Sequence, residues 1–281
     1  MMPAQNEDML IEPIWLANHL DDPTVRAVEI DVSTAAYNQW HIDGAALWNI
    51  YADLKDERYR PVGKLAFERL LARSGIGPDT TVVCYGYAPA FGYWLLKLYG
   101  HAKVRILNCS RDAWRAEGYP CSAETVQQQT EIPPLAERDA ELFADLPAVR
   151  EIIGRAGTTV LDVRSEAEFV GERFWPSGGM EPYGRSGHIP TAVHRPFGQL
   201  YDARGAFLPV EELLKAMPVP ELEEEDELIT YCTVGGRAAT AWYVLTEILG
   251  RKQVRVYDGS WAEWGLSADA PVETGKVPAS A

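Results

Sequence analysis

The sequence contains one series of short motifs twice, and this duplication limits the fold more than any other feature. Residues 41–45 (HIDGA) resemble residues 188–192 (HIPTA), and residues 82–86 (VVCYG) resemble residues 228–232 (LITYC). From the opening histidine to the end of the second motif is 45 residues in one copy and 44 in the other. Two further pairs of segments also correspond, namely 30–33 with 161–164 and 107–110 with 257–260. A period of this length predicts two domains of one fold instead of a solenoid of short repeats.

The length and the alternation of apolar segments indicate the class of that fold. A chain of 281 residues, 47% of them hydrophobic, is long enough for two domains with cores of their own. Short β-branched runs alternate with helical periodicity, which is typical of a mostly parallel sheet flanked by helices. The first copy predicts strands at 28–32, 81–85 and 104–107 and helices near 67–74 and 91–99.

Composition marks the boundary between the two copies. The segment from about 126 to 141 is rich in Gln, Pro and Glu, as expected of a linker. We therefore predict an α/β protein with a first domain over residues 1–125, a linker over 126–144 and a second domain over 145–281.

The charge of the chain limits its partners. The formal net charge is -15, which argues against nucleic acid or an anionic membrane surface as a partner. No apolar stretch of the sequence is long enough to span a bilayer. Any site for an anion must therefore be a local positive pocket in a negative molecule.

The number and spacing of the cysteines indicate the redox state of the compartment and argue against a cysteine-based metal site. The chain has four cysteines, which are Cys84, Cys109, Cys121 and Cys232, and they form no CxxC pair. This pattern favours a reducing compartment over a disulfide scaffold. The polar, acidic start lacks the features of a signal peptide, so we predict a cytoplasmic protein, or a periplasmic one if a signal has been removed. The sequence has no phosphate-binding glycine fingerprint, metal cluster or flavin motif, so we expect no metal and no cofactor.

Cys232 is the strongest candidate for chemistry. It follows an apolar run at 228–231, precedes a helical segment at 238–249, and begins the loop sequence CTVGGR. The two glycines allow a sharp turn that exposes backbone N–H groups, and the helix N-terminus adds partial positive charge. A thiol in this position should ionise easily and act as a nucleophile. The alternative is a buried structural thiol, which is common for free cysteine.

The residues after the cysteine are the candidates for substrate binding. We expect the backbone N–H groups of Thr233, Val234, Gly235, Gly236 and Arg237 to hold an anionic substrate or a charged sulfur adduct. The Arg237 side chain would hold the anionic end of a donor or the loop itself.

The segment before the second motif supplies further candidates. Arg185 is a candidate for a second anion contact. Asp162 and Arg164 are expected to form a structural pair at a strand end, and His188 to be a structural hydrogen-bonding residue.

The two copies differ where chemistry would occur. Gly86 stands in the first copy where Cys232 stands in the second, so the first copy should be inactive and structural. The second copy has an insertion near 171–186: Asp31 to His41 is 10 residues, whereas Asp162 to His188 is 26. This insertion is rich in glycine and aromatic residues and is either a lid or pocket wall or a surface loop.

These motifs together resemble the rhodanese family in its tandem-domain form, the thiosulfate and 3-mercaptopyruvate sulfurtransferases. The resemblance rests on Asp162-Val163-Arg164 with Glu168-Phe169, on GHIP at 187–190, on YCTVGGR at 231–237, and on VYDGSW at 256–261 with Trp264. It covers nearly the whole second half, with weaker matches in the first. It implies two rhodanese-like domains, an inactive first and a catalytic second, and transfer of a sulfane sulfur through a cysteine persulfide.

The resemblance implies a sulfurtransferase that moves sulfur from a small anionic donor to a thiophilic acceptor such as cyanide or a thiol, with Cys232 carrying the persulfide. Thiosulfate-type loops often have a basic residue after the cysteine, where this chain has Thr233. Mercaptopyruvate-type loops tend to lack the final arginine, where this chain has Arg237. We favour thiosulfate because of Arg237, with 3-mercaptopyruvate as the alternative donor.

Two other functions stay open at this point. Cysteine-dependent phosphatases of related fold use a loop with five residues between cysteine and arginine, whereas four residues separate Cys232 from Arg237. A persulfide carrier that passes sulfur to a protein partner is the other alternative. The sequence does not assign a role to Cys121, which would have to lie near Cys232 to act as a resolving thiol.

Overall fold

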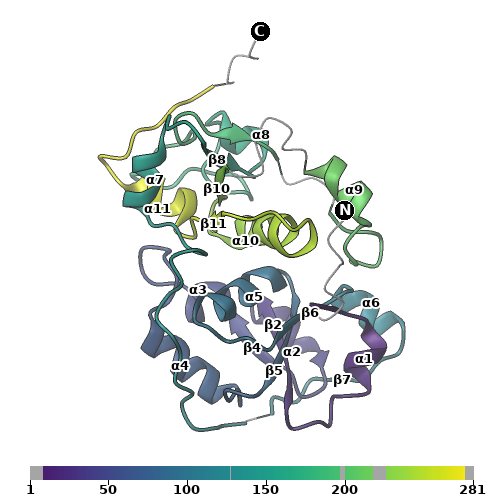
Figure 1. The fold of residues 1–281 in the computed structure, drawn as a ribbon. Helices are drawn as coiled ribbons and strands as arrows, with labels where there is room; N and C mark the ends of the chain where they lie inside the picture. The colour runs from purple at the N-terminus through teal and green to yellow at the C-terminus, as the bar shows by residue number, and fades with distance from the viewer. Residues whose placement is uncertain (1–8, 127, 197–199, 218–225, 276–281) are drawn as a thin grey trace. The chain divides into compact units, whose positions relative to one another are not determined.

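The computed structural model describes residues 9–126, 128–196, 200–217 and 226–275, and their contacts divide the chain into two compact units (Figure 1). The first unit comprises Met1–Asp56, Pro61–Asp139 and Leu200–Pro209. The second comprises Glu57–Arg60, Ala140–Gln199 and Val210–Ala281. Each unit therefore includes a short segment from the other half of the sequence.

A five-stranded parallel sheet forms the centre of the first unit, in the order β1-β6-β5-β2-β4. In that order the strands are Leu10–Ile11, Val104–Leu107, Thr81–Gly86, Val25–Asp31 and Ala46–Asn49. A separate antiparallel pair joins β3 (His41–Ile42) to β7 (Cys121–Ser122). The helices are α1 (Pro13–Ala17), α2 (Ala35–Gln39), α3 (Ile50–Asp53), α4 (Lys64–Arg73), α5 (Pro89–Leu98) and α6 (Arg111–Ala116). The predicted strands and helices of this copy are confirmed.

The second unit has a parallel sheet of the same design, in the order β11-β10-β8-β9. In that order the strands are Val254–Val256, Glu227–Tyr231, Thr158–Asp162 and Val193–His194. The helices are α7 (Leu146–Ile152), α8 (Glu166–Phe169), α9 (Val210–Ala216), α10 (Gly236–Tyr243), the π-helix η1 (Val244–Ile248) and α11 (Ser260–Leu266). Phe143 bridges Val256 in parallel at the edge where the first unit has β1, so the two topologies agree. The α/β class with helix-flanked parallel sheets is confirmed.

The duplication is visible in individual hydrogen bonds. The Ile42 N–H donates to the Tyr85 hydroxyl at 3.1 Å, and the Ile189 N–H donates to the Tyr231 hydroxyl at 3.2 Å. Tyr85 directly precedes Gly86, and Tyr231 directly precedes Cys232. The structure therefore makes Gly86 the counterpart of Cys232, as the sequence predicted.

The two motif histidines also have the same contacts. The Nδ1 atom of His41 lies 2.9 Å from the Tyr37 carbonyl, and that of His188 lies 2.9 Å from the Phe169 carbonyl. The His41 ring also stacks on the Tyr37 ring, with centroids 3.8 Å apart, and the His188 ring stacks on the Phe169 ring, with centroids 3.7 Å apart. His188 is buried and positions its segment, which confirms its structural role.

One correspondence between the copies was wrong. Tyr85 pairs with Glu29 in the sheet register, whereas Tyr231 pairs with Asp162. The counterpart of Asp162 is therefore Glu29, two residues before Asp31. An exchange of Glu for Asp concealed the true match, and a chance Asp two positions later produced the false one. Burial raises the pKa of the Glu29 carboxyl, although Tyr85 and Arg111, whose Nε lies 3.4 Å away, act against that rise.

The loop that contains Gly86 differs from its counterpart in backbone as well as in side chain. Gly86 has φ +103, and a Cβ added there would lie 2.9 Å from the Ile30 carbonyl oxygen. That oxygen accepts hydrogen bonds from the N–H groups of Tyr87 and Ala88, which holds the loop close to β2. The first unit therefore lacks a thiol at this position and also lacks the room for one.

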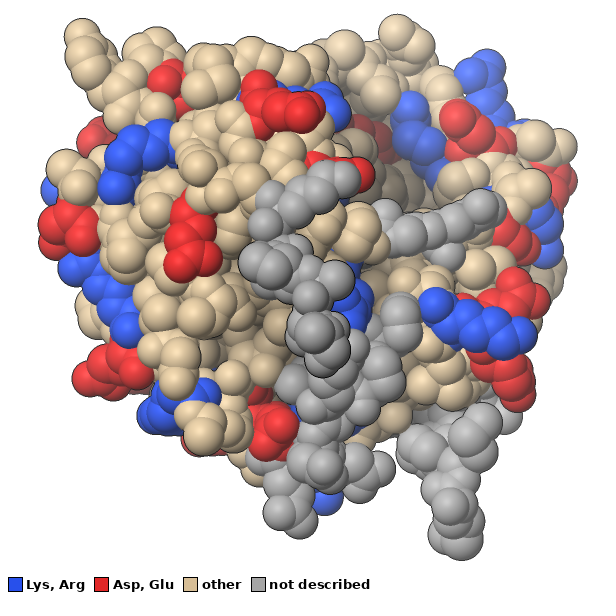
Figure 2. All heavy atoms as spheres, turned by 90° about the horizontal axis from the view of Figure 1, so that it is seen from above, with Lys and Arg blue, Asp and Glu red and all other residues tan. Residues whose placement is uncertain are grey.

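None of the helices in the described part of the chain is long and apolar enough to cross a bilayer. Figure 2 shows acidic and basic side chains interspersed over the described part of one face of the molecule. This mixed surface provides no continuous basic patch on the visible described area, which is what a nucleic acid would need.

We predict that Gly86→Ala destabilises the protein more than Gly118→Ala. Gly118 also has a positive φ, of +81, but a Cβ there meets no atom within 4 Å. Left-handed backbone alone should cost Gly118→Ala about 1–2 kcal/mol, and the close approach to Ile30 should add about 1–3 kcal/mol in Gly86→Ala. Denaturant unfolding followed by tryptophan fluorescence measures the free energy of unfolding of both variants. An equal decrease in the two would show that the backbone moves to relieve the clash at Gly86.

Candidate functional site

Cys232 lies in a tight turn between β10 and α10 in the second unit. The strand ends at Tyr231, and the helix begins at Gly236, with Gly235 in the left-handed conformation at φ +91. This turn folds the loop back, so that the Gly235 N–H donates to the Cys232 Sγ at 3.2 Å. The cysteine is only 1% exposed. The loop thus curls around the sulfur atom and directs a backbone donor at it.

The backbone of Cys232 is held by the start of α11. Its N–H donates to the Ser260 hydroxyl at 3.1 Å, and its carbonyl accepts from the Trp261 N–H at 3.0 Å. The Ser260 hydroxyl in turn donates to the Tyr257 carbonyl at 2.8 Å. Ser260 has φ +53, a left-handed conformation that is unfavourable for a residue with a side chain. Sequence reasoning missed this support, although the repeated motif at 257–260 marked the segment.

An ion pair between the partly exposed Arg237 and the buried Glu168 closes the other side of the loop. Arg237 donates to both carboxylate oxygens of Glu168, from Nη1 to Oε2 at 3.0 Å and from Nη2 to Oε1 at 2.7 Å. Thr233 completes the cluster: its hydroxyl donates to Glu168 Oε1 at 2.6 Å and accepts from Arg237 Nη2 at 2.7 Å. Bidentate pairs of this kind are strong and fix geometry. The two ends of the loop are therefore tied to one carboxylate, and the guanidinium group holds the loop.

The charges of this pair reinforce each other. Burial acts to raise the pKa of Glu168, but hydrogen bonding and attraction from Arg237, with hydrogen bonds from Thr233 and Ser165, lower it to about 2. Burial acts to lower the pKa of Arg237, but Glu168 and Cys232 raise it above its usual value. Both groups are therefore charged across the physiological range.

Glu168 owes its position to the first turn of α8. Ser165 is the N-cap, and Glu168 Oε2 accepts from the Ser165 N–H at 3.1 Å and from its hydroxyl at 2.7 Å, which is a capping box. Sequence analysis gave Glu168 no role. The pattern Ser-x-x-Glu before Phe169 was the available signal, because a capping box fixes where the glutamate side chain lies.

The expected pair of Asp162 and Arg164 is present and wholly buried. Arg164 Nη2 donates to Asp162 Oδ2 at 2.6 Å and to the Gly187 carbonyl at 2.7 Å. Its guanidinium carbon lies 4.4 Å from the centroid of the Trp261 ring. This pair joins the end of β8 to the GHIP segment and to α11, the helix whose first residues bond to the Cys232 backbone. These contacts confirm its structural role.

Arg185 does not join the Cys232 loop through any of its described hydrogen bonds. Its guanidinium group donates to the Ala270 carbonyl at 2.7 Å and also to the Ser267 carbonyl. Its role as a second anion contact stays a prediction, and the geometry shows an anchor for the segment that follows α11.

The insertion at 171–186 is packed onto the second unit. Phe174 is fully buried in its core, and the Arg185 N–H donates to the Gly265 carbonyl at 3.0 Å. Its tip is open to solvent, with Tyr183 100% exposed and Met180 58% exposed. The insertion is thus an anchored loop with an apolar tip, and its role as a lid or pocket wall stays a prediction.

The other cysteines differ from Cys232 in their surroundings. Cys84 is in the middle of β5, where burial raises its pKa well above the usual value. Burial also raises the pKa of Cys109, to about 12. Cys121 is exposed. Within the described residues, no group of three or more His, Cys, Asp or Glu side chains is arranged to bind a metal.

A duplicated α/β fold whose second copy holds a thiol in a strand–loop–helix turn defines the class of this protein. The model of the Rhodanese-like domain matches residues 12–117 and 145–267. The chain belongs to the rhodanese family, with two such domains in tandem.

Curated relatives align over almost their whole length. A protein of Haloferax volcanii is 38% identical over 285 residues, covering 96% of this chain and 97% of its own. One of Mycolicibacterium smegmatis is 38% identical over 277 residues, covering 95% and 98%. Both are named "Putative thiosulfate sulfurtransferase".

Solved structures share the fold. Wild-type EanB superposes with a TM-score of 0.85 at 22% identity, over 97% of this chain and 70% of that one. YnjE superposes with a TM-score of 0.84 at 24% identity, over 98% and 70%.

We predict that the ionisation of Glu168 makes the free energy of unfolding fall as the solution becomes acidic. Its pKa is about 2 in the folded protein against an ordinary value of 4.5, so its contribution of about 3 kcal/mol is complete above pH 4.5 and is lost as the pH falls toward 2. Glu168→Gln should therefore destabilise the protein at pH 7, and that deficit should shrink below pH 4.5. Unfolding free energies at several pH values measure this effect.

Glu172→Gln is the matched control, because Glu172 follows closely in the chain but is exposed. It should leave the acid dependence unchanged. An identical pH dependence in Glu168→Gln and the wild type would contradict the assigned charge pair.

Proposed function

We propose that this protein is a thiosulfate sulfurtransferase that carries a sulfane sulfur on Cys232 as a persulfide. The observation that carries the proposal is the turn that folds around the Cys232 sulfur, with the Gly235 N–H 3.2 Å from Sγ. The names of the curated relatives support the same activity. The catalytic residue is Cys232.

In the first step, the Cys232 thiolate attacks the outer sulfur of thiosulfate. A new sulfur–sulfur bond forms to Sγ, and the bond between the two sulfurs of thiosulfate breaks with its electron pair on the departing sulfite. The persulfide keeps the negative charge of the thiolate. No oxidant or reductant is needed, because the sulfane sulfur is transferred at its existing oxidation level.

In the second step, a thiophilic acceptor attacks the outer sulfur of the persulfide. With cyanide, a carbon–sulfur bond forms, the sulfur–sulfur bond breaks, and thiocyanate leaves while Cys232 returns as thiolate. The enzyme alternates between free and persulfide forms, which is a double-displacement scheme.

The backbone of the loop would stabilise the charged sulfur. We assign this role to the N–H groups of residues 233–237, which lie just before and at the start of α10; the Gly235 N–H, 3.2 Å from Sγ, supports this assignment. Because Glu168 occupies the guanidinium fork of Arg237, this arginine positions the loop. The anionic end of the donor then depends on backbone N–H groups, and Arg185 is the remaining candidate cation.

This arrangement changes the reason for preferring thiosulfate over 3-mercaptopyruvate. The paired Arg237 no longer distinguishes the two donors, so the preference rests on the relatives. The same pairing disfavours a phosphatase, because an arginine that would hold a phosphate is already bound to a buried carboxylate.

We further propose that the first domain (1–125) is structural, joined by the linker (126–144) to the catalytic domain (145–281). The crowded backbone at Gly86 supports this division of roles. The free state of all four cysteines supports a cytoplasmic location. The acceptor would be cyanide, a small thiol or a protein thiol.

We predict that thiosulfate adds one sulfur atom to the wild-type protein, that cyanide removes it, and that Cys232→Ser does not acquire it. Intact-mass spectrometry before and after cyanide treatment measures this. Cys121→Ser is the matched control, because it removes an exposed thiol and should retain the adduct.

An adduct that persists in Cys232→Ser would place the chemistry elsewhere. No adduct from thiosulfate, but one from 3-mercaptopyruvate, would replace the donor and keep the mechanism. Persulfide formation with slow release to cyanide and fast release to a protein thiol would favour the carrier.

A further inference from the structure

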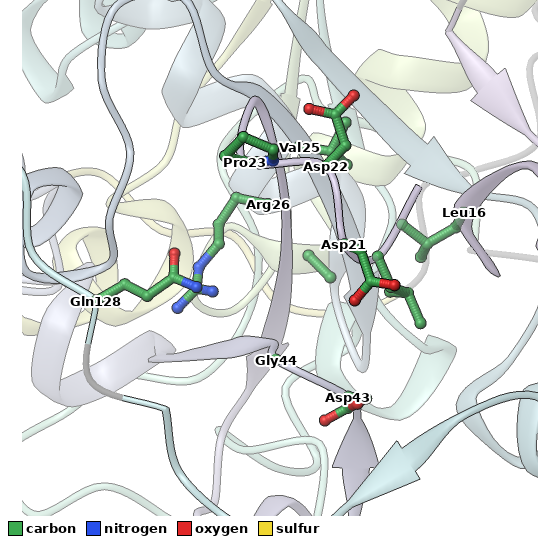
Figure 3. Close-up of a pocket in the computed structure, with 11 residues that line it drawn as sticks. Leu16, Asp21, Asp22, Pro23, Val25, Arg26, Asp43, Gly44 and Gln128 are labelled. Carbon is green, nitrogen blue, oxygen red and sulfur yellow. The ribbon is translucent and has the colours of Figure 1, made fainter. Parts of the chain in front are cut away.

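The first unit contains a pocket of about 430 Å³ away from the position of Gly86 (Figure 3). Its walls include residues at the start of β2 and the turn at Gly44 just before β4. These are the amino ends of parallel strands, whereas Gly86 ends β5 at the opposite edge of the same sheet. The pocket has the size of small-molecule sites in proteins.

Arg26 is the unusual residue of this pocket. It is 4% exposed, and its Nε donates to the Ser74 carbonyl at 2.8 Å. Among the residues that the structure describes, no carboxylate lies within ion-pair distance of Arg26, and its terminal nitrogens have no hydrogen-bond partner. These nitrogens are not among the atoms cut off from solvent, so they are accessible from the pocket that Arg26 lines. Burial lowers the pKa of Arg26. Most of this side chain is removed from water, and no carboxylate of the described residues neutralises it. An anionic group that enters the pocket would therefore be stabilised by the guanidinium group.

Carboxylates line another part of the same pocket. Asp21 and Asp43 are both exposed, and in the described part of the chain neither has an ion-pair partner. Asp22 differs, because its Oδ1 already accepts from Thr24 at 2.8 and 2.7 Å. Figure 3 shows Arg26 and Gln128 on one side of the pocket and Asp21 on another.

The remaining wall is apolar. Leu20 and Val25 line the pocket and are partly buried against a core cluster that includes Leu16, which is 0% exposed. A ligand that fills the space would therefore place hydrocarbon against Leu20 and Val25.

We propose that this pocket binds a small zwitterion, an α-amino acid with an apolar side chain. Its carboxylate pairs with the Arg26 guanidinium, its ammonium group faces Asp21 and Asp43, and its side chain lies against Leu20 and Val25. A simple anion fits less well, because two free carboxylates and a net charge of -15 oppose it. A simple cation would not neutralise Arg26, which has no ion-pair partner among the described residues.

Isothermal titration calorimetry of the full chain tests this with L-leucine as the probe. Two analogues isolate the charges: 4-methylpentanoate lacks the ammonium group, and 3-methylbutylamine lacks the carboxylate. We expect L-leucine to bind and each analogue to bind at least about tenfold more weakly. No heat of binding with L-leucine, or equal affinity for 4-methylpentanoate, would overturn the proposal.

Three variants locate the site. Arg26→Met should weaken L-leucine binding by about tenfold or more, and Asp21→Asn should weaken it by several-fold. Arg69→Met is the matched control, because Arg69 is an exposed arginine of α4 in the same unit, and it should bind as the wild type does. Unchanged affinity in both Arg26→Met and Asp21→Asn would place any binding elsewhere.

Circular dichroism establishes that Arg26→Met is folded. Asp21→Asn changes only an exposed side chain, so it keeps the test decisive if Arg26→Met does not fold. In that case, full binding by Asp21→Asn would contradict the assigned orientation.

Discussion

The ion pair between Arg237 and Glu168 is the interaction on which the shape of the Cys232 loop depends. The loop has two glycines, which allow many backbone conformations, so contacts with other segments help to set its shape. Glu168 does this by bonding to Thr233 at one end of the loop and to Arg237 at the other. Glu168 is 1% exposed, so water cannot readily replace Arg237 and Thr233 as its partners, although the Arg237 side chain itself is 27% exposed.

The first unit shows what the same fold becomes without this device. Its sheet, its tyrosine and its motif histidine are held as in the second unit. It also keeps a buried acid–arginine contact, in which Arg111 reaches Glu29 from a different segment. By the same correspondence, Ala36 stands where Glu168 stands, because His41 bonds to Tyr37 as His188 bonds to Phe169. The first unit therefore has the same scaffold, but Ala36 and Gly86 occupy the positions of Glu168 and Cys232.

Much of the fold and part of the site followed from the sequence. Strand and helix positions depend on local hydrophobic periodicity, and the duplication gave each motif a second, independent observation. Local periodicity could not predict the partners of Arg237 and Arg185, because these partners are distant in the sequence. Arg237 contacts Glu168, 69 positions away, and Arg185 contacts Ser267 and Ala270, 82 and 85 positions away. The pairing of Asp162 with Asp31 failed for a related reason: strand register is a property of two strands together.

The sequence by itself determined the two-domain α/β architecture, the position of the only cysteine in a glycine-rich turn, and the resemblance to the rhodanese family. These are encoded in order, spacing and residue type along the chain. Only the tertiary structure decided that Arg237 braces the loop, that Gly86 leaves no room for a side chain, and that Arg26 has no counter-ion among the described residues. Each of these depends on which distant groups meet in space, and burial determines how strongly their charges act.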